Sequence, residues 1–166
     1  MTLTLILTRH AKSDWDDPLL SDHDRVLNPR GRGDAPKIGA WLAAQGHMPD
    51  AAMVSSARRT LETWERLAPA LEHPVAMTVE PDLYHAEAQQ ILQHLRGASA
   101  RKVMLIGHNP GIGECAHRIV AEPAPHPRFI DYPTCATLVA EFPGDDWSSV
   151  DWWSGRVVDF VVPRDL

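Results

Sequence analysis

Histidines and arginines stand close behind three apolar runs of this chain. Arg9-His10 follows the first run, Arg58-Arg59 comes shortly after the second, and His108-Asn109 follows the sequence KVMLIG. Arginine carries a permanent charge on a planar fork of donors that matches phosphate oxygens, and histidine supplies a nitrogen nucleophile. The three pairs together therefore indicate a site that binds an anion.

Each pair is weak evidence when it stands alone. An Arg-His pair is common by chance and is often part of a solvated turn. Arg58 and Arg59 fit a salt-bridged surface helix with Glu62 and Glu65 about equally well. The segment 107–111 (GHNPG) is stronger, because a glycine-rich turn from a strand into a helix presents backbone N–H groups to an anion, although a plain turn has the same composition. Together they are stronger evidence for a functional site, because each of the three pairs follows the end of a different predicted strand.

The elements that must position these residues alternate along the chain. Short apolar, β-branched runs predict strands, and helix signals such as Asn28-Pro29, an N-cap followed by proline, lie between them. Predicted strands are 2–8, 51–55, 75–79, 102–107, 134–142 and 157–162, and predicted helices are 29–46, 57–71, 87–95 and 112–120. This order predicts an α/β fold, a three-layer α/β/α sandwich with a mostly parallel central sheet. In such sheets ligands bind beyond the carboxyl ends of the strands, where the three pairs fall.

Composition limits the class of partner. The 166 residues carry 16 Lys and Arg against 22 Asp and Glu, a formal charge of −6, which disfavours nucleic acid and anionic membranes as partners. The length suits one domain, residues 1–166. The first apolar run is too short for a membrane span or a signal peptide, so we expect a cytoplasmic protein. Cys115 and Cys135 form no CxxC pair and are expected to be buried thiols.

Taken together, the motifs resemble those of the histidine phosphatase superfamily, which includes the phosphoglycerate mutases, and within it the short SixA-type phosphohistidine phosphatases. LILTRHAKSDW carries the family's Arg-His pair at Arg9 and His10, SSARRTLETW its second arginine at Arg59, and IGHNPG its second histidine at His108. The segment DRVLNPRGRGDAP and the C-terminal region are also similar, so the resemblance spans nearly the whole chain. It implies the phosphoglycerate mutase-like fold and four catalytic residues: His10, Arg9, Arg59 and His108.

The resemblance gives each of these residues a chemical role. Neutral His10 attacks phosphorus and forms a phosphohistidine intermediate that water hydrolyses, while Arg9 and Arg59 hold the charged oxygens. His108, when protonated, donates a hydrogen bond where charge accumulates. Clustered cations lower histidine pKa values and keep His10 nucleophilic. These groups supply the positive charge, so we expect no metal and no cofactor. Two polar residues flanking the motifs are candidate phosphate ligands or helix caps: Ser13 and Asn109.

Two points separate this chain from the family pattern. Ala11 replaces the usual glycine, a change that is costly only if the position needs a positive φ angle, and we expect it to be tolerated. No proton donor stands out. The candidates are the carboxylates of Asp16, Glu80, Asp82 and Glu87, each of which fits a solvated surface group at least as well.

Several functional alternatives are open at this stage. Nine histidines raise the question of a zinc hydrolase, but no HExxH or similar spacing is present. A non-catalytic phosphate-binding module would not require both arginines and both histidines. A mutase of this superfamily is longer, with segments around the substrate for which this chain has little room.

The leaving group decides the predicted substrate. A phosphate ester releases an alkoxide that needs a well-placed acid, whereas phosphohistidine releases an imidazole nitrogen more readily. We therefore predict phosphohistidine on a signalling or phosphotransfer protein as the substrate, with a small phosphorylated metabolite as the alternative. Trp147, Trp152 and Trp153 could belong to the core, to an interface or to a docking surface, and core is the default for each tryptophan taken singly.

Overall fold

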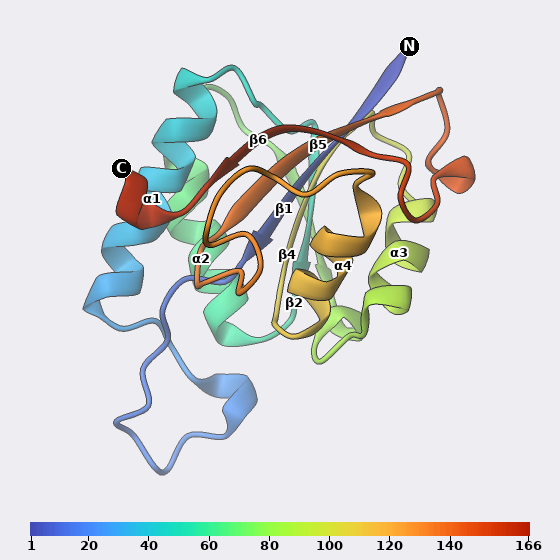
Figure 1. Ribbon diagram of the computed structural model, residues 1–166. Coiled ribbons are helices and arrows are strands. Elements are labelled where there is room, and N and C mark those ends of the chain that lie inside the picture. The colour runs from blue at the N-terminus through green and yellow to red at the C-terminus, as the bar shows by residue number, and fades with distance from the viewer.

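A six-stranded sheet forms the centre of the computed structural model, which describes all 166 residues (Figure 1). The strand order is β3-β2-β4-β1-β5-β6, and every neighbouring pair is parallel except β1–β5 and β5–β6. The strands are β1 (Thr2–Arg9), β2 (Ala51–Ser55), β3 (Ala76–Glu80), β4 (Lys102–Gly107), β5 (Thr137–Pro143) and β6 (Arg156–Val161). Only β5 runs against the other five, so the predicted mostly parallel sheet is confirmed.

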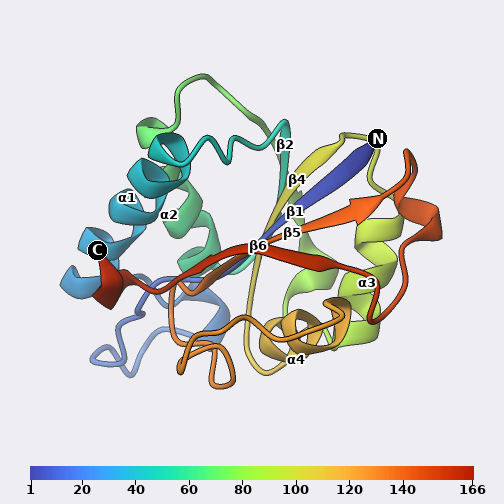
Figure 2. The same cartoon turned by 45° about the horizontal axis from the view of Figure 1, so that its top comes forward.

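Two helices cover each face of this sheet, as Figure 2 shows. The helices are α1 (Pro29–Ala44), α2 (Arg58–Leu67), α3 (Ala88–Arg96) and α4 (Gly111–Ile119). One core of 26 buried residues joins the sheet to α3 and α4, and a second core of 16 joins it to α1 and α2. These are the three layers that the alternation of elements predicts.

The central strands contribute side chains to both cores. In β1, Leu5 and Leu7 lie in the larger core while Ile6 points into the smaller one, because successive side chains of a strand face opposite sides. In β4, Leu105 and Ile106 divide in the same way. A strand buried on both faces has no polar alternation, which explains why these segments appear in the sequence as continuous apolar runs.

The start of α1 is fixed by its cap and by one glycine. The Asn28 side chain accepts a hydrogen bond from the Gly31 amide at 2.9 Å, and Pro29 occupies the first turn, so the predicted N-cap is confirmed. A Cβ atom on Gly31 would lie 2.1 Å from the carbonyl oxygen of Lys12. The helix therefore approaches the segment that follows β1 too closely for any larger residue.

The predicted elements differ from the observed ones mainly at their ends. The helix predicted to reach residue 71 ends at Leu67 and continues as a short 3₁₀ turn containing Pro69. The last-but-one strand was predicted from residue 134 but begins at Thr137, because Cys135 has a φ of 63° and the Ala136 amide donates to the Pro133 carbonyl in a turn. Both cysteines are buried and free, as predicted.

The three late tryptophans do not share one environment. Trp147 is buried, and its indole N–H donates to the Ala100 carbonyl, as expected for a core residue. Trp152 is half-buried beneath the Arg118 guanidinium, 4.2 Å from the ring centroid. Trp153 is 61% exposed and has a φ of 61°, so the default of a core residue does not hold for it.

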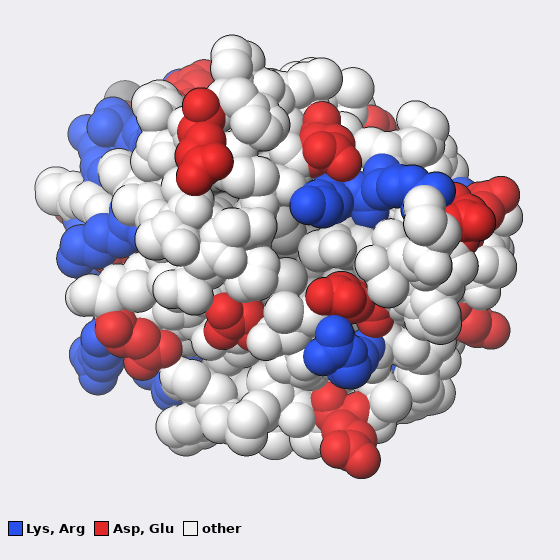
Figure 3. All heavy atoms as spheres, turned by 90° about the horizontal axis from the view of Figure 1, so that it is seen from above, with Lys and Arg blue, Asp and Glu red and all other residues white.

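The surface is mixed in charge where the parallel strands begin. Acidic and basic side chains are interspersed on that face, which Figure 3 shows from above. No helix of the structure is long and apolar enough to cross a membrane.

Candidate active site

His10 lies immediately after β1 and is 6% exposed. Its Nδ1 atom is 2.7 Å from the carbonyl oxygen of Ala11. A carbonyl oxygen only accepts, so the neutral ring must carry its proton on Nδ1, and Nε2 keeps its lone pair. Ala11 is itself buried without a positive φ angle, and its amide donates to Thr63 Oγ1 at 3.0 Å, so the expected tolerance of alanine here is confirmed.

The surroundings keep His10 neutral. Burial lowers the pKa of His10 well below its ordinary value, and the nearby charges of Arg9 and Arg59 lower it further, although the bond to the Ala11 carbonyl opposes them. A histidine that stays unprotonated at neutral pH has its lone pair available at Nε2. This is the state that a nitrogen nucleophile requires.

Arg9 and Arg59 reach this point from the end of β1 and the first turn of α2. Arg9 Nη1 donates to the Tyr132 carbonyl at 3.3 Å. Arg59 Nη1 and Nη2 donate to the backbone carbonyl and to Oδ2 of Asp22, at 2.7 and 3.2 Å. The Nε atom of each arginine is buried and has no hydrogen-bond partner within the protein. Each guanidinium is thus held in place while its Nε–H is left for an anion.

His108 follows β4, and its ring centroid lies 5.3 Å from that of His10. Its Nε2 atom is 2.7 Å from the Ser55 hydroxyl oxygen, whereas its buried Nδ1 has no partner. Burial, followed by the charge of Arg59, lowers the pKa of His108 to about 3. The free protein therefore holds His108 unprotonated, so the donation from a protonated ring that the sequence analysis considered does not apply to it. When Ser55 donates to Nε2, neutral His108 still carries a proton on Nδ1 and donates from there.

The four residues predicted as catalytic are thus gathered at one point, whereas Ser13 and Asn109 use their polar atoms elsewhere. The Ser13 hydroxyl accepts from Arg25 Nη1. Asn109 Nδ2 donates to the carbonyls of Asp131 and Tyr132, and its Oδ1 accepts from the Gly113 amide in the first turn of α4. Asn109 thus bonds the first turn of α4, in line with the helix-cap alternative, and Ser13 holds the loop after β1 through Arg25. A role of either residue as a phosphate ligand stays a prediction.

The predicted proton donors are dispersed. Asp16 and Asp82 are exposed, in the loop after β1 and in the turn after β3. Glu80 accepts from the Thr78 hydroxyl and lies 3.9 Å from His94. Glu87 is the N-cap of α3 and lines a cavity of about 510 Å³ that His108 also lines. Only Glu87 among the four is brought to the His108 side of the site, and it is exposed there.

Asp22 is a site residue that the sequence analysis missed. Its carboxylate accepts from Arg59, from Arg25 Nε at 3.2 Å and from the Tyr84 hydroxyl at 2.5 Å, and it lies 3.5 Å from His85 Nε2. These bonds, that of Tyr84 first, hold its pKa well below the usual range, so Asp22 stays ionised. It orients Arg59 and ties the loop after β1 to the segment after β3.

Tyr84 and His85 were missed as well. Their rings are 4.0 Å apart, and the His85 ring lies nearly parallel to that of His108 at 6.3 Å. Tyr84 also lies under the Arg59 guanidinium, 5.9 Å from its ring centroid. The signal that points to them is the one already used for the other pairs, because they follow the end of the third predicted strand.

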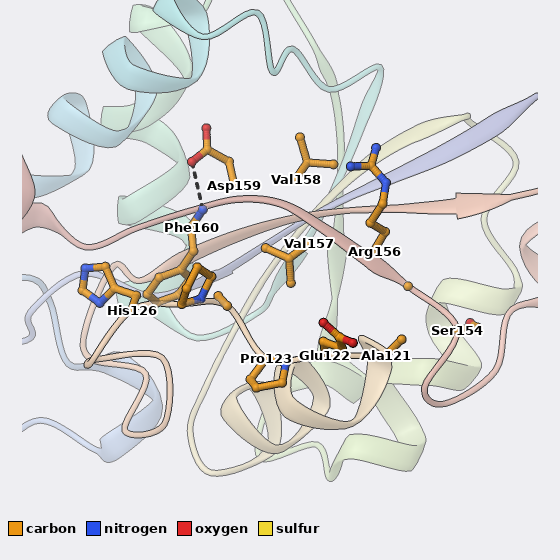
Figure 4. A pocket seen from close by; sticks show the side chains of 13 residues that line it. Ala121, Glu122, Pro123, His126, Ser154, Arg156, Val157, Val158, Asp159 and Phe160 are labelled. Carbon is orange, nitrogen blue, oxygen red and sulfur yellow. Dashed lines mark hydrogen bonds between the residues drawn. The ribbon is translucent and has the colours of Figure 1, made fainter.

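Another cavity lies away from these residues. It has a volume of about 610 Å³ and runs between β6 and the segment 121–126, where Figure 4 shows His126, Asp159 and Phe160 at one end. None of the four catalytic candidates lines it. No set of three His, Cys, Asp or Glu side chains is arranged to hold a metal ion, so the zinc alternative lacks a ligand set.

Comparison with known proteins agrees with this geometry. A model of the histidine phosphatase superfamily (branch 1) matches residues 5–87. An uncharacterised chloroplastic protein of Arabidopsis thaliana is 31% identical over 162 residues, which cover 91% of this chain and 72% of that protein. The chain belongs to the histidine phosphatase superfamily. An uncharacterised protein of Mycobacterium tuberculosis is 29% identical to this histidine phosphatase, over 94% of the chain and 99% of that relative.

Solved structures share the fold of this histidine phosphatase over nearly its whole length. A protein of Agrobacterium tumefaciens that carries the name SixA superposes with a TM-score of 0.81 at 24% identity, covering 97% of this chain and 98% of that one. The histidine phosphatase SixA in complex with tungstate gives 0.80 at 20% identity, with coverages of 98% and 99%. A mycobacterial glucosyl-3-phosphoglycerate phosphatase gives 0.59 at 15% identity, covering 95% and 98%. The fold is that of the SixA proteins.

Proposed function

We propose that this protein is a phosphatase that transfers a phosphoryl group to His10 and releases it to water. The observation that carries the proposal is the state of His10: a buried neutral ring whose proton is fixed on Nδ1 by the Ala11 carbonyl, leaving Nε2 free. Around it, Arg9, Arg59 and His108 each hold a buried nitrogen without a partner in the protein. Such donors suit the equatorial oxygens of a phosphoryl group.

The reaction then proceeds in two displacements. The Nε2 lone pair of His10 attacks phosphorus, and the bond to the leaving group breaks with its electron pair as the N–P bond forms. Water attacks the phosphohistidine next; the N–P bond breaks, its electron pair returns to Nε2, and inorganic phosphate leaves after losing a proton to solvent. Arg9 and Arg59 balance the oxygen charge in both steps. Tungstate bound to a SixA protein of the same fold, an oxyanion shaped like phosphate, supports this reading of the donors.

The proposed substrate is phosphohistidine on a signalling or phosphotransfer protein. Asp22 is the carboxylate that bonds to Arg59, one of the two arginines beside His10. Its lowered pKa keeps Asp22 ionised and unable to donate a proton. Glu80 pairs with Thr78 and His94 instead, while Asp16 and Asp82 are exposed. Glu87, on the His108 side of the site, is an exposed residue at the N-cap of α3. An imidazole leaves more readily than an alkoxide, so a site in which the only carboxylate bonded to the catalytic residues is the ionised Asp22 suits phosphohistidine better than a phosphate ester.

A comparison of substrates tests this proposal. We expect kcat/KM on a phosphorylated histidine phosphotransfer domain to exceed that on every member of a panel of phosphorylated metabolites. His10→Ala should abolish turnover of all of them, and rapid quenching without acid should reveal phosphate on His10 of the parent protein. A metabolite that is hydrolysed far faster than any phosphohistidine protein would overturn the substrate, and normal turnover by His10→Ala would overturn the mechanism.

Chelation tests the source of positive charge. Because the arginines and His108 surround His10, we expect excess chelator to leave both the hydrolysis of an aryl phosphate and the far-UV circular dichroism unchanged. A large loss of activity that zinc restores would favour the metallohydrolase alternative over the His10 mechanism.

A further inference from the structure

Two loops that are anchored at the catalytic residues carry exposed apolar side chains. Eight large apolar residues of the whole chain are exposed, and four of them lie in the loops 14–24 and 126–133. Leu19 is 93% exposed and Ile130 is 80% exposed, and Trp15 and Leu20 accompany Leu19. Large exposed apolar side chains on loops beside a functional site are typical of a surface that meets another macromolecule.

The first of these loops is anchored at the catalytic residues. It leaves the sheet after β1 and is closed at its base by a bridge between Ser13 and Leu27. It includes Asp22, which holds Arg59. Arg25 lies 3.5 Å from the Trp15 ring centroid and fixes that side chain at the loop's flank. Figure 1 shows the loop, in blue, projecting from the body of the protein at the lower left.

The second loop is anchored at the same site from the other side. Arg9 donates to the Tyr132 carbonyl, and Asn109 donates to the carbonyls of Asp131 and Tyr132. Ile130 stands immediately before these residues and makes no use of the core, whereas its neighbour Phe129 is buried. Both loops are therefore fixed to the residues that follow β1 and β4, while their apolar side chains face outward.

We propose that Leu19, Leu20 and Ile130, with Trp15, form a docking surface for a folded protein that carries the phosphorylated histidine. This inference rests on the proposed function and specifies its substrate as a protein surface around the phosphohistidine. A small polar metabolite has no area to bury against these side chains. A protein whose surface beside the histidine is apolar does, and burying one such side chain contributes on the order of a tenfold gain in affinity or more.

The charge of the first loop, residues 14–24, further limits the class of protein that can dock there. Residues 14–24 include five aspartates and no lysine or arginine, and Asp16, Asp17 and Asp24 are exposed. The partner surface is therefore apolar at its centre and basic at its rim. An anionic membrane is repelled by this loop. A second copy of the chain, which carries the same aspartates and a net charge of −6, is repelled as well.

Two single substitutions test the docking surface: Leu19→Ser and Ile130→Ser. Each variant and the parent are assayed on a folded phosphohistidine phosphotransfer domain, on a short phosphohistidine peptide and on an aryl phosphate. We expect KM for the folded domain to rise about tenfold or more, with kcat/KM for the peptide and the aryl phosphate unchanged. Leu166→Ser, a change of an exposed leucine at the C-terminus, is the matched control and should alter none of the three.

Charge reversal gives an independent measurement. The kcat/KM of the parent on the folded domain should fall as salt is added, and Asp16→Lys combined with Asp17→Lys should remove that dependence. Unchanged KM for the folded domain in both serine variants would overturn the docking surface while the proposed function stands, because the parent still hydrolyses phosphohistidine. Equal losses on the aryl phosphate would overturn it too, as would a parent dimer that Leu19→Ser converts to a monomer. Failure of the parent on every phosphohistidine substrate would instead overturn the proposed function, and this inference with it.

Discussion

At the scale of single residues, the position of the proton on the His10 ring decides which nitrogen can attack phosphorus. The Ala11 carbonyl holds the proton on Nδ1, and the strand that ends at Arg9 places the ring where burial keeps it neutral. His108 shows the same effect, since its pKa of about 3 leaves it a neutral donor until a charged ligand is present. Both histidines thus serve as hydrogen-bonding or nucleophilic groups without carrying charge in the free protein.

The two arginines beside His10, Arg9 and Arg59, can be tested one at a time. Arg9→Ala and Arg59→Ala should each lower kcat/KM on an aryl phosphate by about 10²–10⁴, because each removes a cation that balances the oxygen charge in the transition state. Asp22→Asn should cost less, since Arg59 keeps the bond to the Asp22 carbonyl and loses only the carboxylate. Steady-state kinetics with this substrate measures all three.

Arg58 is the matched control for Arg59. It is adjacent in sequence but points outward and pairs with Glu65, with Nη2 to Oε2 at 2.7 Å. Arg58→Ala should therefore leave kcat/KM unchanged. If Arg58→Ala were the damaging change and Arg59→Ala were silent, the pocket would be misplaced.

At the scale of secondary structure, the strand ends gather the site and close packing of α1 fixes the loop that leads away from His10. The Gly31 position contacts the Lys12 carbonyl, and the Asn28 amide donates to the same oxygen at 3.0 Å. The loop 14–24, which carries Leu19 and Leu20, begins shortly after this contact. Its orientation relative to the catalytic residues thus depends on α1 approaching the segment after β1 without a side chain between them.

Two glycines of α1 measure that dependence. Gly31→Ala should lower the free energy of unfolding by about 1–3 kcal/mol, because its Cβ would lie 2.1 Å from the Lys12 carbonyl oxygen and the backbone must shift. Gly33→Ala has nothing within 4 Å of the new methyl group and should stabilise the helix by about 0.5–1 kcal/mol. Urea denaturation monitored by circular dichroism compares them. Equal effects of the two substitutions would contradict a close contact at Gly31.

At the scale of the whole molecule, the site affects the pH dependence of stability. The pKa values of His10 and His108 in the folded protein lie below the ordinary value of 6.5, so the unfolded chain binds more protons than the folded one as the pH falls below 6.5. The stability that these two neutral histidines contribute is fully present above pH 6.5. It is lost as the pH falls toward their pKa values in the folded protein. Asp22 and Glu62, whose pKa values are lowered from 3.8 and 4.5, act at lower pH.

We therefore expect the free energy of unfolding to fall between pH 7 and pH 5, with a slope approaching about 1.4 kcal/mol per pH unit for each of the two histidines. Urea titrations at several pH values measure the slope. His108→Gln should reduce it by one histidine's share, whatever its effect on activity. A stability that is flat across this range, or a slope unaltered in His108→Gln, would show that these histidines titrate normally in the folded protein.

The sequence alone determined the architecture, because local signals encode it. Apolar runs such as KVMLIG, buried on both faces, marked the central strands, and Asn28-Pro29 marked the start of α1. The rule that ligands bind beyond strand ends then placed His10, Arg59 and His108 together before any contact was known. The start of β5 was not predictable in this way. Cys135 has a positive φ angle, so the strand begins only at Thr137, and the hydrophobic pattern does not show such a turn.

Tertiary structure alone decided the protonation of the site and the residues that complete it. Asp22, Tyr84 and His108 are far apart in sequence, and only folding places the Asp22 carboxylate against the Tyr84 hydroxyl and Arg59. A pKa depends on burial and on neighbouring charges in space, so the neutral state of His108 could not be read from its motif. The same holds for Leu19 and Ile130, since apolar residues in a sequence are expected inside, and only the fold shows that these two remain outside beside the site.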